Sequence, residues 1–404
     1  MKIIVAIPYA PWPVTRGTDR LILNLLDGLA DNHDVVLVTA ALSKGELERL
    51  REIEKPRIGV RAILAPHRQS AFHRIYYKVR NISTALFAGV PAQVGYAAPK
   101  RFLQLVADTA KEEKADLILA SYWHLYRLPD YIEHSKLVLI THDLDFIVNP
   151  GRLQAMSGFA RFWAAIRLKT LERIEKMAYE RYETILTVTP SDADVLGRLP
   201  ATAGLTVYPL PLALDLSSFN SGAFERERNR ILFIGMFYSD FNRDALRFFM
   251  KEVFPIVLAK NPAAHFEVVG HGVDKSLRAA AGVNVAFVGG VEDIRPYIGK
   301  CSVMVLPLRF CGGVRIRMME AAAMGTPVVS TSIGVSGMGL KASRDYLEAE
   351  STNEMAEAIV KLLEDSDEAR RIGNNARLWA EENISMESYP ARLDTMLKKI
   401  TAST

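Results

Sequence analysis

The chain has 404 residues, which is more than one hydrophobic core of ordinary size contains, so its length predicts two domains. Hydrophobic residues make up 49% of the chain, which excludes a disordered protein. The 50 basic and 46 acidic residues leave a formal net charge of +4, too small by itself to indicate nucleic-acid binding, and we expect no nucleic-acid partner.

Cysteine content and hydropathy indicate where the protein works. The two cysteines, Cys301 and Cys311, do not have the spacing of a metal site, and so few cysteines fit a reduced compartment. No apolar run approaches the length needed to cross a bilayer. The N-terminal run contains early prolines and is too short for a signal peptide, so we interpret it as a first strand. We therefore expect a cytoplasmic protein.

Strands and helices alternate through the first half of the chain. Strands are predicted at residues 2–8, 34–39, 60–64, 116–121, 136–141 and 184–189. Helices are predicted from Thr18, over residues 159–182 and over residues 192–199, with Ser191 as the cap of the last one. The loop after the first strand contains only Gly17, so it lacks the three-glycine fingerprint of a dinucleotide-binding dehydrogenase. The alternation predicts an α/β domain.

Residues 67–80, HRQSAFHRIYYKVR, are both basic and aromatic. We favour a solvated basic helix that packs its aromatic side chains on the core. A patch that contacts a membrane surface or an anionic acceptor is the alternative. No RNA- or DNA-binding motif accompanies these residues.

Polar and aromatic side chains follow two of the predicted strands. Trp123 and His124 come after the strand at 116–121, and His142 and Asp143 come after the strand at 136–141. Ligands of open α/β sheets bind beyond the carboxyl ends of strands. His142 is a candidate general base or donor-binding group. Asp143 and Asp145 have the aspartate-x-aspartate form of some metal sites, but this tripeptide is common and we expect no metal.

A second set of strands follows a proline-containing crossing at residues 205–215. These strands are predicted at residues 231–235, 266–270, 283–288, 303–308, 328–331 and 346–349. Helices are predicted at residues 354–363 and 368–381, and a final, mostly helical stretch at 384–400. The second half is therefore a second α/β domain.

Residues 303–331 form a strand, a glycine loop, a helix and a strand. Gly312 and Gly313 let a ligand approach the backbone. The helix predicted from Val314 to Met324 presents unpaired amides and the positive end of its dipole to this loop. Strand, loop and helix together predict a binding site for an anion.

Three charged side chains belong to this helix. Arg315 and Arg317 lie near its start, where a cation has the wrong sign for the dipole unless an anion binds. They are either diphosphate ligands or solvated side chains. Glu320 either pairs with Arg317, three residues earlier, or accepts hydrogen bonds from sugar or ribose hydroxyls.

The run GGVRIRMMEAAAMGTPVVSTSIG resembles the donor-site motif of glycosyltransferase family 4, whose members are retaining enzymes with the GT-B fold. The second of the family's two motif glutamates matches Glu320, which implies a contact with the nucleotide ribose. The first falls on Gly312, so the chain departs from the pattern there. A branch of the family has a glycine-rich loop followed by arginine and a second basic residue, as Arg315 and Arg317 do here.

The resemblance also implies roles elsewhere in the donor site. Gly17 matches a glycine that faces the donor phosphate or sugar, although a helix-entry turn explains it equally. Gly235 matches a glycine that most members follow with an arginine and, six residues later, a lysine; this chain has Met236 and Asn242 there. Arg243, or else Arg315 with Arg317, can supply the missing charge. Gly313 and Val314 belong to the diphosphate loop. His271 is either a turn residue or a sugar contact.

The resemblance implies an α/β GT-B fold, with two Rossmann-like doubly wound domains facing a cleft. Residues 1–204 would bind the acceptor, with Trp123, His124 and Asp143 on that side. Residues 205–383 would bind a nucleotide-diphosphate sugar, and residues 384–404 would cross back to the first domain. The implied function is retaining, metal-independent sugar transfer without a cofactor, to a glycan, lipid-linked or small-molecule acceptor, in cell-surface polysaccharide or glycoconjugate synthesis. A non-catalytic nucleotide- or glycan-binding protein and a nucleotide-sugar epimerase are the alternatives.

Overall fold

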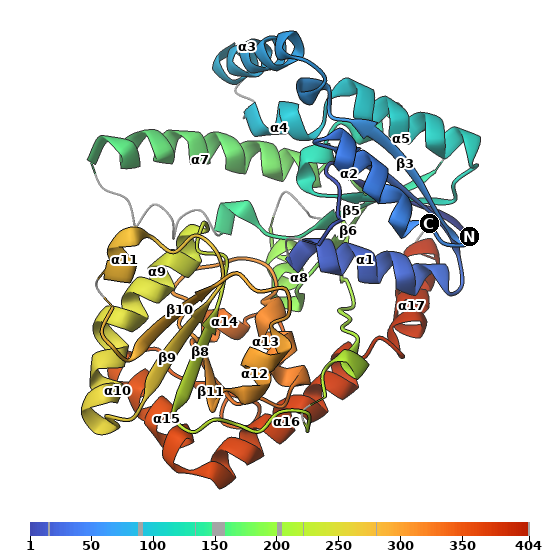
Figure 1. Ribbon diagram of the computed structural model, residues 1–404. Helices are drawn as coiled ribbons and strands as arrows, with labels where there is room; N and C mark the ends of the chain where they lie inside the picture. Colours follow the sequence, from blue (N-terminus) through green and yellow to red (C-terminus); the bar gives the residue numbers. More distant parts are fainter. Residues whose placement is uncertain are drawn as a thin grey trace. The chain divides into compact units, whose positions relative to one another are not determined.

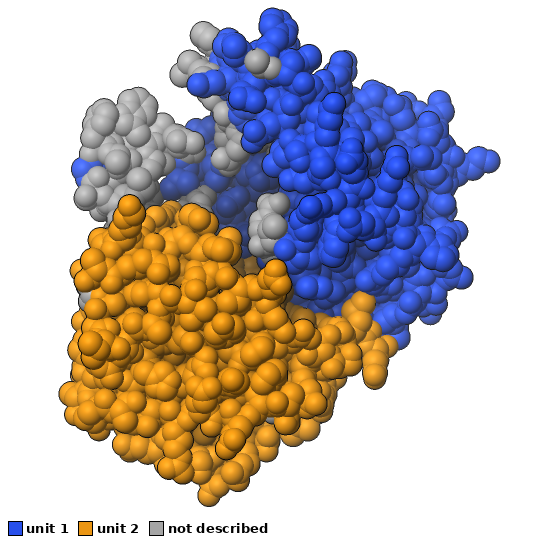
Figure 2. Space-filling model, in the orientation of Figure 1, with its two compact units in different colours: residues 1–213, 388–404 blue, residues 214–387 orange. Residues whose placement is uncertain are grey.

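The computed structural model divides into two compact units, one of residues Met1–Ala213 and Ser388–Thr404 and one of Leu214–Glu387 (Figure 2). It describes residues 1–14, 17–87, 92–133, 135–147, 158–199, 204–220, 222–279 and 281–402. The division lies a little C-terminal to each of the boundaries set from the sequence, which were 204/205 and 383/384. None of the helices in the described ranges has the length and apolar character of a bilayer span.

Unit 1 is built on a parallel sheet of 7 strands in the order β3-β2-β1-β4-β5-β6-β7 (Figure 1). The strands are β1 (Lys2–Ile7), β2 (Asp34–Ala41), β3 (Ile58–Leu64), β4 (Leu117–Ser121), β5 (Lys136–Thr141), β6 (Thr184–Thr187) and β7 (Thr206–Pro209). Its helices are α1 (Gly17–Ala30), α2 (Lys44–Arg49), α3 (Ala71–Phe87), α4 (Ala92–Ala97), α5 (Lys100–Glu112), α7 (Gly158–Tyr179), α8 (Pro190–Gly197) and α17 (Tyr389–Ala402). Short 3-10 turns lie at η1 (Leu50–Ile53), η2 (Pro66–Arg68), η3 (Trp123–Leu125) and η4 (Leu128–Tyr131).

Unit 2 repeats this architecture with a parallel sheet of 6 strands in the order β10-β9-β8-β11-β12-β13. The strands are β8 (Arg230–Ile234), β9 (His265–Val269), β10 (Val285–Gly289), β11 (Val303–Leu306), β12 (Val328–Ser330) and β13 (Leu347–Glu348). The helices are α9 (Asp240–Phe248), α10 (Phe254–Lys260), α11 (Lys275–Ala279), α12 (Arg295–Lys300), α13 (Ile316–Ala323), α14 (Ser332–Val335), α15 (Thr352–Glu364) and α16 (Ser366–Ile384). A π-helical segment, η7 (Phe249–Val253), joins α9 to α10, and a 3-10 turn, η6 (Leu216–Ser218), opens the unit.

The central strands are apolar because helices cover both faces of a parallel sheet. Every residue of β4, β8 and β11 is buried. Residues of β1, Ile3 to Ile7, are completely buried as well. These continuous apolar runs confirm the predicted α/β class with two doubly wound sheets.

Each sheet reverses its strand order at one place, between β1 and β4 in unit 1 and between β8 and β11 in unit 2. The loops that leave neighbouring strands there diverge to opposite faces of the sheet, which opens a crevice at the carboxyl edge. The loops after β1, β4, β8 and β11 are therefore the places where a ligand is expected. Unit 1 has in addition the adjacent loop after β5, which follows Thr141.

Two local expectations were wrong. The Thr189 side chain, and not that of Ser191, caps α8 by accepting a hydrogen bond from the Asp192 amide at 3.0 Å, because that helix begins two residues earlier than expected. In the segment 67–80, only Tyr77 packs inward among the aromatic side chains, while Phe72 and Tyr76 are exposed. The favoured interpretation, in which this helix packs its aromatic residues on the core, is therefore incorrect for these two.

The C-terminal helix α17 belongs to unit 1, where it packs on α1. Gly28 of α1 makes this contact possible, because a Cβ atom there would lie 2.6 Å from the Tyr389 ring and 2.9 Å from Leu393. Asn32 and His33 add hydrogen bonds to the Asp394 carboxylate, at 2.8 and 2.9 Å. The chain thus returns to its first unit after completing the second.

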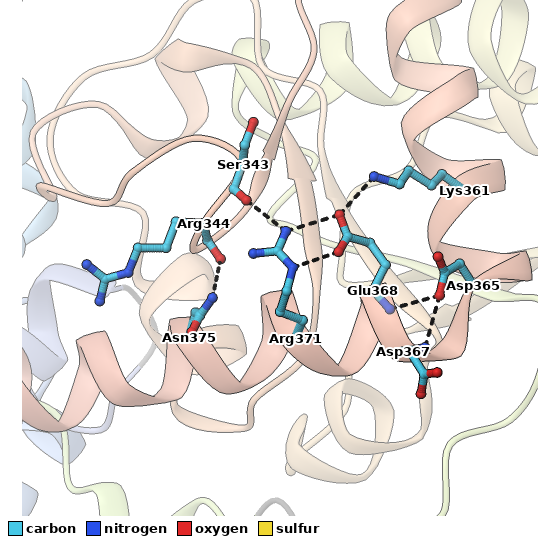
Figure 3. A network of polar contacts seen from close by, with 8 residues as sticks. All are labelled: Ser343, Arg344, Lys361, Asp365, Asp367, Glu368, Arg371 and Asn375. Atoms are coloured by element: carbon cyan, nitrogen blue, oxygen red, sulfur yellow. Dashed lines mark hydrogen bonds and ion pairs between the residues drawn. The ribbon is translucent and has the colours of Figure 1, made fainter.

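A polar network joins α15, α16 and the loop before β13 (Figure 3). The Glu368 carboxylate accepts hydrogen bonds from Arg371 at 2.7 Å and from Lys361 at 2.8 Å. Arg371 also donates to the Ser343 carbonyl at 2.9 Å, and Asp365 caps α16 through the Glu368 amide at 2.9 Å. Arg371 and Lys361, in that order, lower the pKa of Glu368 from 4.5 to about 2.

Removing this carboxylate tests the contribution of the network. Glu368→Gln is expected to lower the free energy of unfolding by about 1 kcal/mol at neutral pH, since two cations lose their partner. Because the native pKa is the lower one, the contribution is full above pH 4.5 and is lost as the pH falls toward about 2. Urea unfolding at several pH values measures it. Glu357→Gln, which breaks one exposed pair with Lys260, is the control and is expected to change little; equal effects of the two variants would contradict a network.

Candidate functional site

The loop between β11 and α13 presents backbone amides at the strand-order reversal of unit 2. Gly313 has a φ of +63°, a left-handed conformation that favours glycine. Arg315 occupies the N-cap position of α13, but no side chain caps this helix. By contrast, Thr331, Ser351 and Asp365 each cap the helix that follows them. The start of α13 therefore keeps amides available for a ligand.

Arg315 is the side chain closest in sequence to those amides. Its Nη1 is buried, and the described residues provide no hydrogen-bond acceptor for it. Its guanidinium carbon lies 6.0 Å from the centre of the Phe241 ring, on α9, which follows β8. Arg315 thus links the two loops that flank the reversal. A buried guanidinium nitrogen without an acceptor is costly, and an anion would remove that cost.

Arg317 and Glu320 form an ion pair within α13. Arg317 Nη1 lies 2.5 Å from Glu320 Oε2, with side-chain exposures of 36% and 12%. The structure therefore contains the pairing that was the alternative role of Glu320. The pair still leaves each group partly accessible, so a ribose contact of Glu320 stays a prediction.

Met236 and Asn242 follow β8, at the two positions where most members of the resembling family have an arginine and a lysine. Asn242 at one of them folds back, and its Nδ2 donates to the Met236 carbonyl at 3.0 Å. The neighbouring Arg243 contacts Asp240 at 2.5 Å and Asp274 at 4.0 Å. Its charge is already compensated by these carboxylates, unlike that of Arg315. Gly235 keeps the turn tight, because a Cβ atom there would lie 3.1 Å from Asn242.

His271 follows β9, one strand further from the reversal. Its ring lies against Gly290, where a Cβ atom would be 1.8 Å from the imidazole Nε2. Its carbonyl accepts a hydrogen bond from the Phe237 amide at 2.8 Å. His271 therefore packs its ring against the loop after β10 and holds the turn after β8 through its backbone.

A second polar cluster lies at the reversal of unit 1, between the loops after β1 and β4. Tyr9 and Tyr122 share a hydrogen bond of 2.7 Å between their hydroxyl groups, and Thr18, at the start of α1, lies 3.2 Å from Tyr9. Tyr122 has a φ of +80°, which is rare for a bulky residue and places its ring across the end of the sheet. Burial is the largest cause that raises the pKa of Tyr122, and the neighbouring Tyr9 is the second, so the Tyr122 hydroxyl stays protonated.

His142 lies directly beneath Tyr122. The two rings stack at 4.4 Å, and His142 Nε2 is 3.2 Å from Ser121 Oγ. The imidazole is only 3% exposed, and burial lowers the pKa of His142 to about 4. The side chain is therefore neutral at physiological pH, as a general base must be, but Tyr122 separates it from solvent.

Trp123 and His124 form a stacked pair, with ring centres 4.2 Å apart. Trp123 is buried and donates from Nε1 to Asp145 Oδ2 at 3.0 Å, so Asp145 is engaged in fixing this loop. Burial lowers the pKa of His124 to about 4 against the opposing charge of Asp145. Asp143 is exposed beside them. No group of three or more His, Cys, Asp or Glu placed to hold a metal ion occurs in the parts of the chain that the structure describes.

Glu175 of α7 fixes the loop after β5, and no motif in the sequence marks it. Its fully buried carboxyl accepts hydrogen bonds from the amides of Asp145 and Phe146, both at 2.9 Å, and from the Tyr179 hydroxyl at 2.7 Å. Burial, with Asp145 nearby, raises the pKa of Glu175 to about 8, while these three hydrogen bonds oppose the rise. Asp145 and Phe146 lie about thirty residues earlier in the chain, so no local pattern could reveal these two contacts.

The structure thus places the predicted residues in two clusters, one in each unit. Gly235, Gly312, Gly313, Val314, Arg315, Arg317 and Glu320 flank the reversal in unit 2, whereas Arg243 is paired with carboxylates and His271 packs against the loop after β10. Trp123, His124, His142 and Asp143 lie at the carboxyl edge of unit 1. Gly17 is the first residue of α1 in the same unit.

Comparison with known proteins agrees with this arrangement. Residues 228–365 match the family model of glycosyl transferases group 1, which confirms the resemblance noted in the sequence. The chain is similar in structure to sucrose-phosphate synthase from Thermosynechococcus elongatus, with 16% identity, a TM-score of 0.73 and 100% coverage of both chains. It is also similar to HepE from Anabaena in a complex with UDP and glucose, with 16% identity, a TM-score of 0.66 and coverage of 98% and 99%. These similarities confirm the GT-B fold.

A curated relative comes from Klebsiella pneumoniae. It is described as an uncharacterized 44.6 kDa protein in the cps region. The two sequences are 24% identical over an alignment 404 positions long, which covers 95% of this chain and 96% of the relative. The similarity therefore extends over both units.

The buried His142 makes a testable contribution to the pH dependence of stability. Its pKa is 6.5 when unfolded and about 4 when folded, so the unfolded state binds more protons between these values. The free energy of unfolding is expected to fall by about 1 kcal/mol per pH unit as the pH drops through this window. Urea unfolding, followed by tryptophan fluorescence, of the wild type and His142→Gln measures the slope, which should be smaller in the variant. Identical slopes would show that His142 is protonated in the folded state.

Proposed function

We propose that the protein is a glycosyltransferase that moves a sugar from a nucleotide-diphosphate sugar to an acceptor. The observation that supports this most is Arg315, whose buried Nη1 has no acceptor among the described residues and which lies at the uncapped start of α13. A diphosphate would accept hydrogen bonds from both the guanidinium group and the helix amides. The match of residues 228–365 to glycosyl transferases group 1 supports the same assignment.

The chemistry proposed for this site is stabilisation of the leaving diphosphate. Negative charge develops on the diphosphate as the bond to the sugar breaks, and preorganised donors stabilise that charge in the transition state. Arg315 and the amides that follow Gly313 are such donors. Arg317, partly neutralised by Glu320, adds positive charge next to them. We propose that transfer proceeds with retention of configuration and without a metal or cofactor.

Unit 1 is proposed to bind the acceptor. The cluster of Tyr9, Tyr122 and His142 lies at its strand-order reversal, and exposed Asp143 adds a carboxylate at the same edge. Neutral His142 would act by positioning Tyr122, with Trp123 and His124 supporting the adjacent loop. We propose a glycan or lipid-linked acceptor and a cytoplasmic protein that works at the inner face of a membrane.

A role in cell-surface polysaccharide synthesis is proposed from the relative in the cps region of Klebsiella pneumoniae. UDP is the first nucleotide to test, because the structurally similar HepE was crystallised with UDP and glucose. GDP and dTDP are the alternatives to compare with it.

Loss of the Arg315 guanidinium is expected to weaken binding of the matching nucleoside diphosphate. Arg315→Ala should cost about 1–3 kcal/mol, which is the contribution of a charged hydrogen bond. Arg243→Ala should cost less, since Asp240 and Asp274 already compensate Arg243. Lys260→Ala is the remote control, since Lys260 pairs with Glu357 at the end of α10, just before the amino end of β9. Isothermal titration calorimetry measures all three, and unchanged affinity in Arg315→Ala would refute the proposed role.

The ribose contact of Glu320 is tested with a modified nucleotide. In the wild type, replacing UDP by its 2′,3′-dideoxy analogue should weaken binding by about 1 kcal/mol or more, because the carboxylate loses hydroxyl donors. In Glu320→Ala the same replacement should have little effect. The difference between the two losses is a coupling energy, which calorimetry on all four combinations provides. A coupling energy near zero would assign Glu320 to its ion pair with Arg317 alone.

A further inference from the structure

Helix α3 of unit 1 exposes a continuous row of large apolar side chains. Phe72 is 74% exposed, Ile75 64%, Tyr76 52% and Val79 62%. Their spacing of three and four residues places them within about a third of the helix circumference. Single exposed apolar residues are ordinary, but a row of four along one helix face indicates a surface that binds something.

The opposite face of α3 attaches the helix to the rest of the unit. Tyr77 is buried against His67, with ring centres 6.4 Å apart, and Asn81 is buried beside Gly95 of α4. Arg80 lies over the Tyr77 ring at 4.3 Å and donates to the Gly95 carbonyl at 3.2 Å. The helix therefore packs inward through aromatic and polar groups and turns its apolar row outward, at the margin of unit 1 next to α4 (Figure 1).

Positive charge borders this apolar row. Lys78 is exposed and lies beside it on the helix, with half-buried His73 on the other side. Exposed Arg74 lies on the same flank as Lys78 but further around the helix from the row, so only its long side chain reaches toward it. No ion pair joins Arg74 or Lys78 to any residue within the described ranges. The chain has no Asp or Glu between Glu54 and Asp108 but nine Lys or Arg in that interval. An acidic partner is therefore complementary to this surface.

We propose that the apolar row of α3, formed by Phe72, Ile75, Tyr76 and Val79, docks the protein onto an anionic lipid bilayer. The apolar side chains would enter the boundary between headgroups and acyl chains, while Arg74 and Lys78 contact anionic headgroups. Bulky apolar side chains flanked by cations are the features of a helix that lies in the membrane interface.

Charge favours a bilayer over a second copy of the chain. In a symmetric dimer the same patch meets itself, so Arg74 and Lys78 of one copy would approach those of the other. Like charges brought together without carboxylates oppose such a contact. A membrane surface rich in anionic lipid instead attracts each basic side chain.

Flotation with lipid vesicles tests the proposal on the full-length protein. The wild type is expected to float with vesicles of equimolar phosphatidylglycerol and phosphatidylcholine and to bind vesicles of phosphatidylcholine much more weakly. The double variant Phe72→Ser with Ile75→Ser should reduce the partition coefficient by about tenfold or more, because two large apolar groups no longer enter the bilayer. Arg74→Gln with Lys78→Gln should reduce it by about fivefold for each charge removed.

Matched substitutions elsewhere separate this surface from general effects. Leu378→Ser removes a 51% exposed leucine of α16, and Lys398→Gln removes an exposed cation of α17; both should float like the wild type. Circular dichroism establishes that each variant is folded. All variants should bind nucleotide as the wild type does. A wild type that floats with vesicles but binds no nucleotide would contradict the proposed function and leave this inference standing.

Three results would overturn the inference. The wild type could fail to float with the anionic vesicles, or the α3 variants could float as well as the wild type. The third result combines two measurements. Sedimentation velocity without lipid would show that the wild type is a dimer and that the double variant Phe72→Ser with Ile75→Ser is a monomer, and neither protein would bind vesicles. That outcome would assign the apolar row to self-association.

Discussion

The donor side of this protein depends on one unsatisfied electrostatic arrangement, in which a cation lies at the positive end of a helix. Arg315 occupies the N-cap of α13, where the helix dipole disfavours positive charge, and its Nη1 is buried without an acceptor in the described structure. Parallel strands β8 and β11 fix the two loops that meet there, and Gly313 leaves the backbone open. A bound diphosphate is the ligand that would satisfy the guanidinium group and the amides together.

The two units use the same architecture for different surfaces. In unit 2 the strand-order reversal presents cations and free amides, as suits a charged leaving group. In unit 1 it presents tyrosine hydroxyls, while Tyr122 covers His142, whose pKa burial lowers to about 4. This difference agrees with the proposal that unit 2 binds the charged donor and unit 1 the acceptor.

Local patterns predicted the strands, the glycine loop and the helix that follows it, since each depends on neighbours in sequence. The α/β fold followed from the alternation of apolar strands and helices, and the family resemblance from the run after Gly312. Contacts between distant segments were not predictable in this way. Glu175 holds the loop at Asp145 from another helix, and Asp274 faces Arg243 from beyond β9. The favoured interpretation of the segment 67–80 was wrong for Phe72 and Tyr76, because helical spacing alone does not say which side a helix packs.

The most direct test of the donor site is a crystal structure of the protein with UDP, or with whichever nucleoside diphosphate binds it most tightly. We expect the diphosphate at the start of α13, with an oxygen about 3 Å from Arg315 Nη1 and others on the amides that follow Gly313. A diphosphate bound elsewhere, with Arg315 still lacking an acceptor, would contradict this expectation.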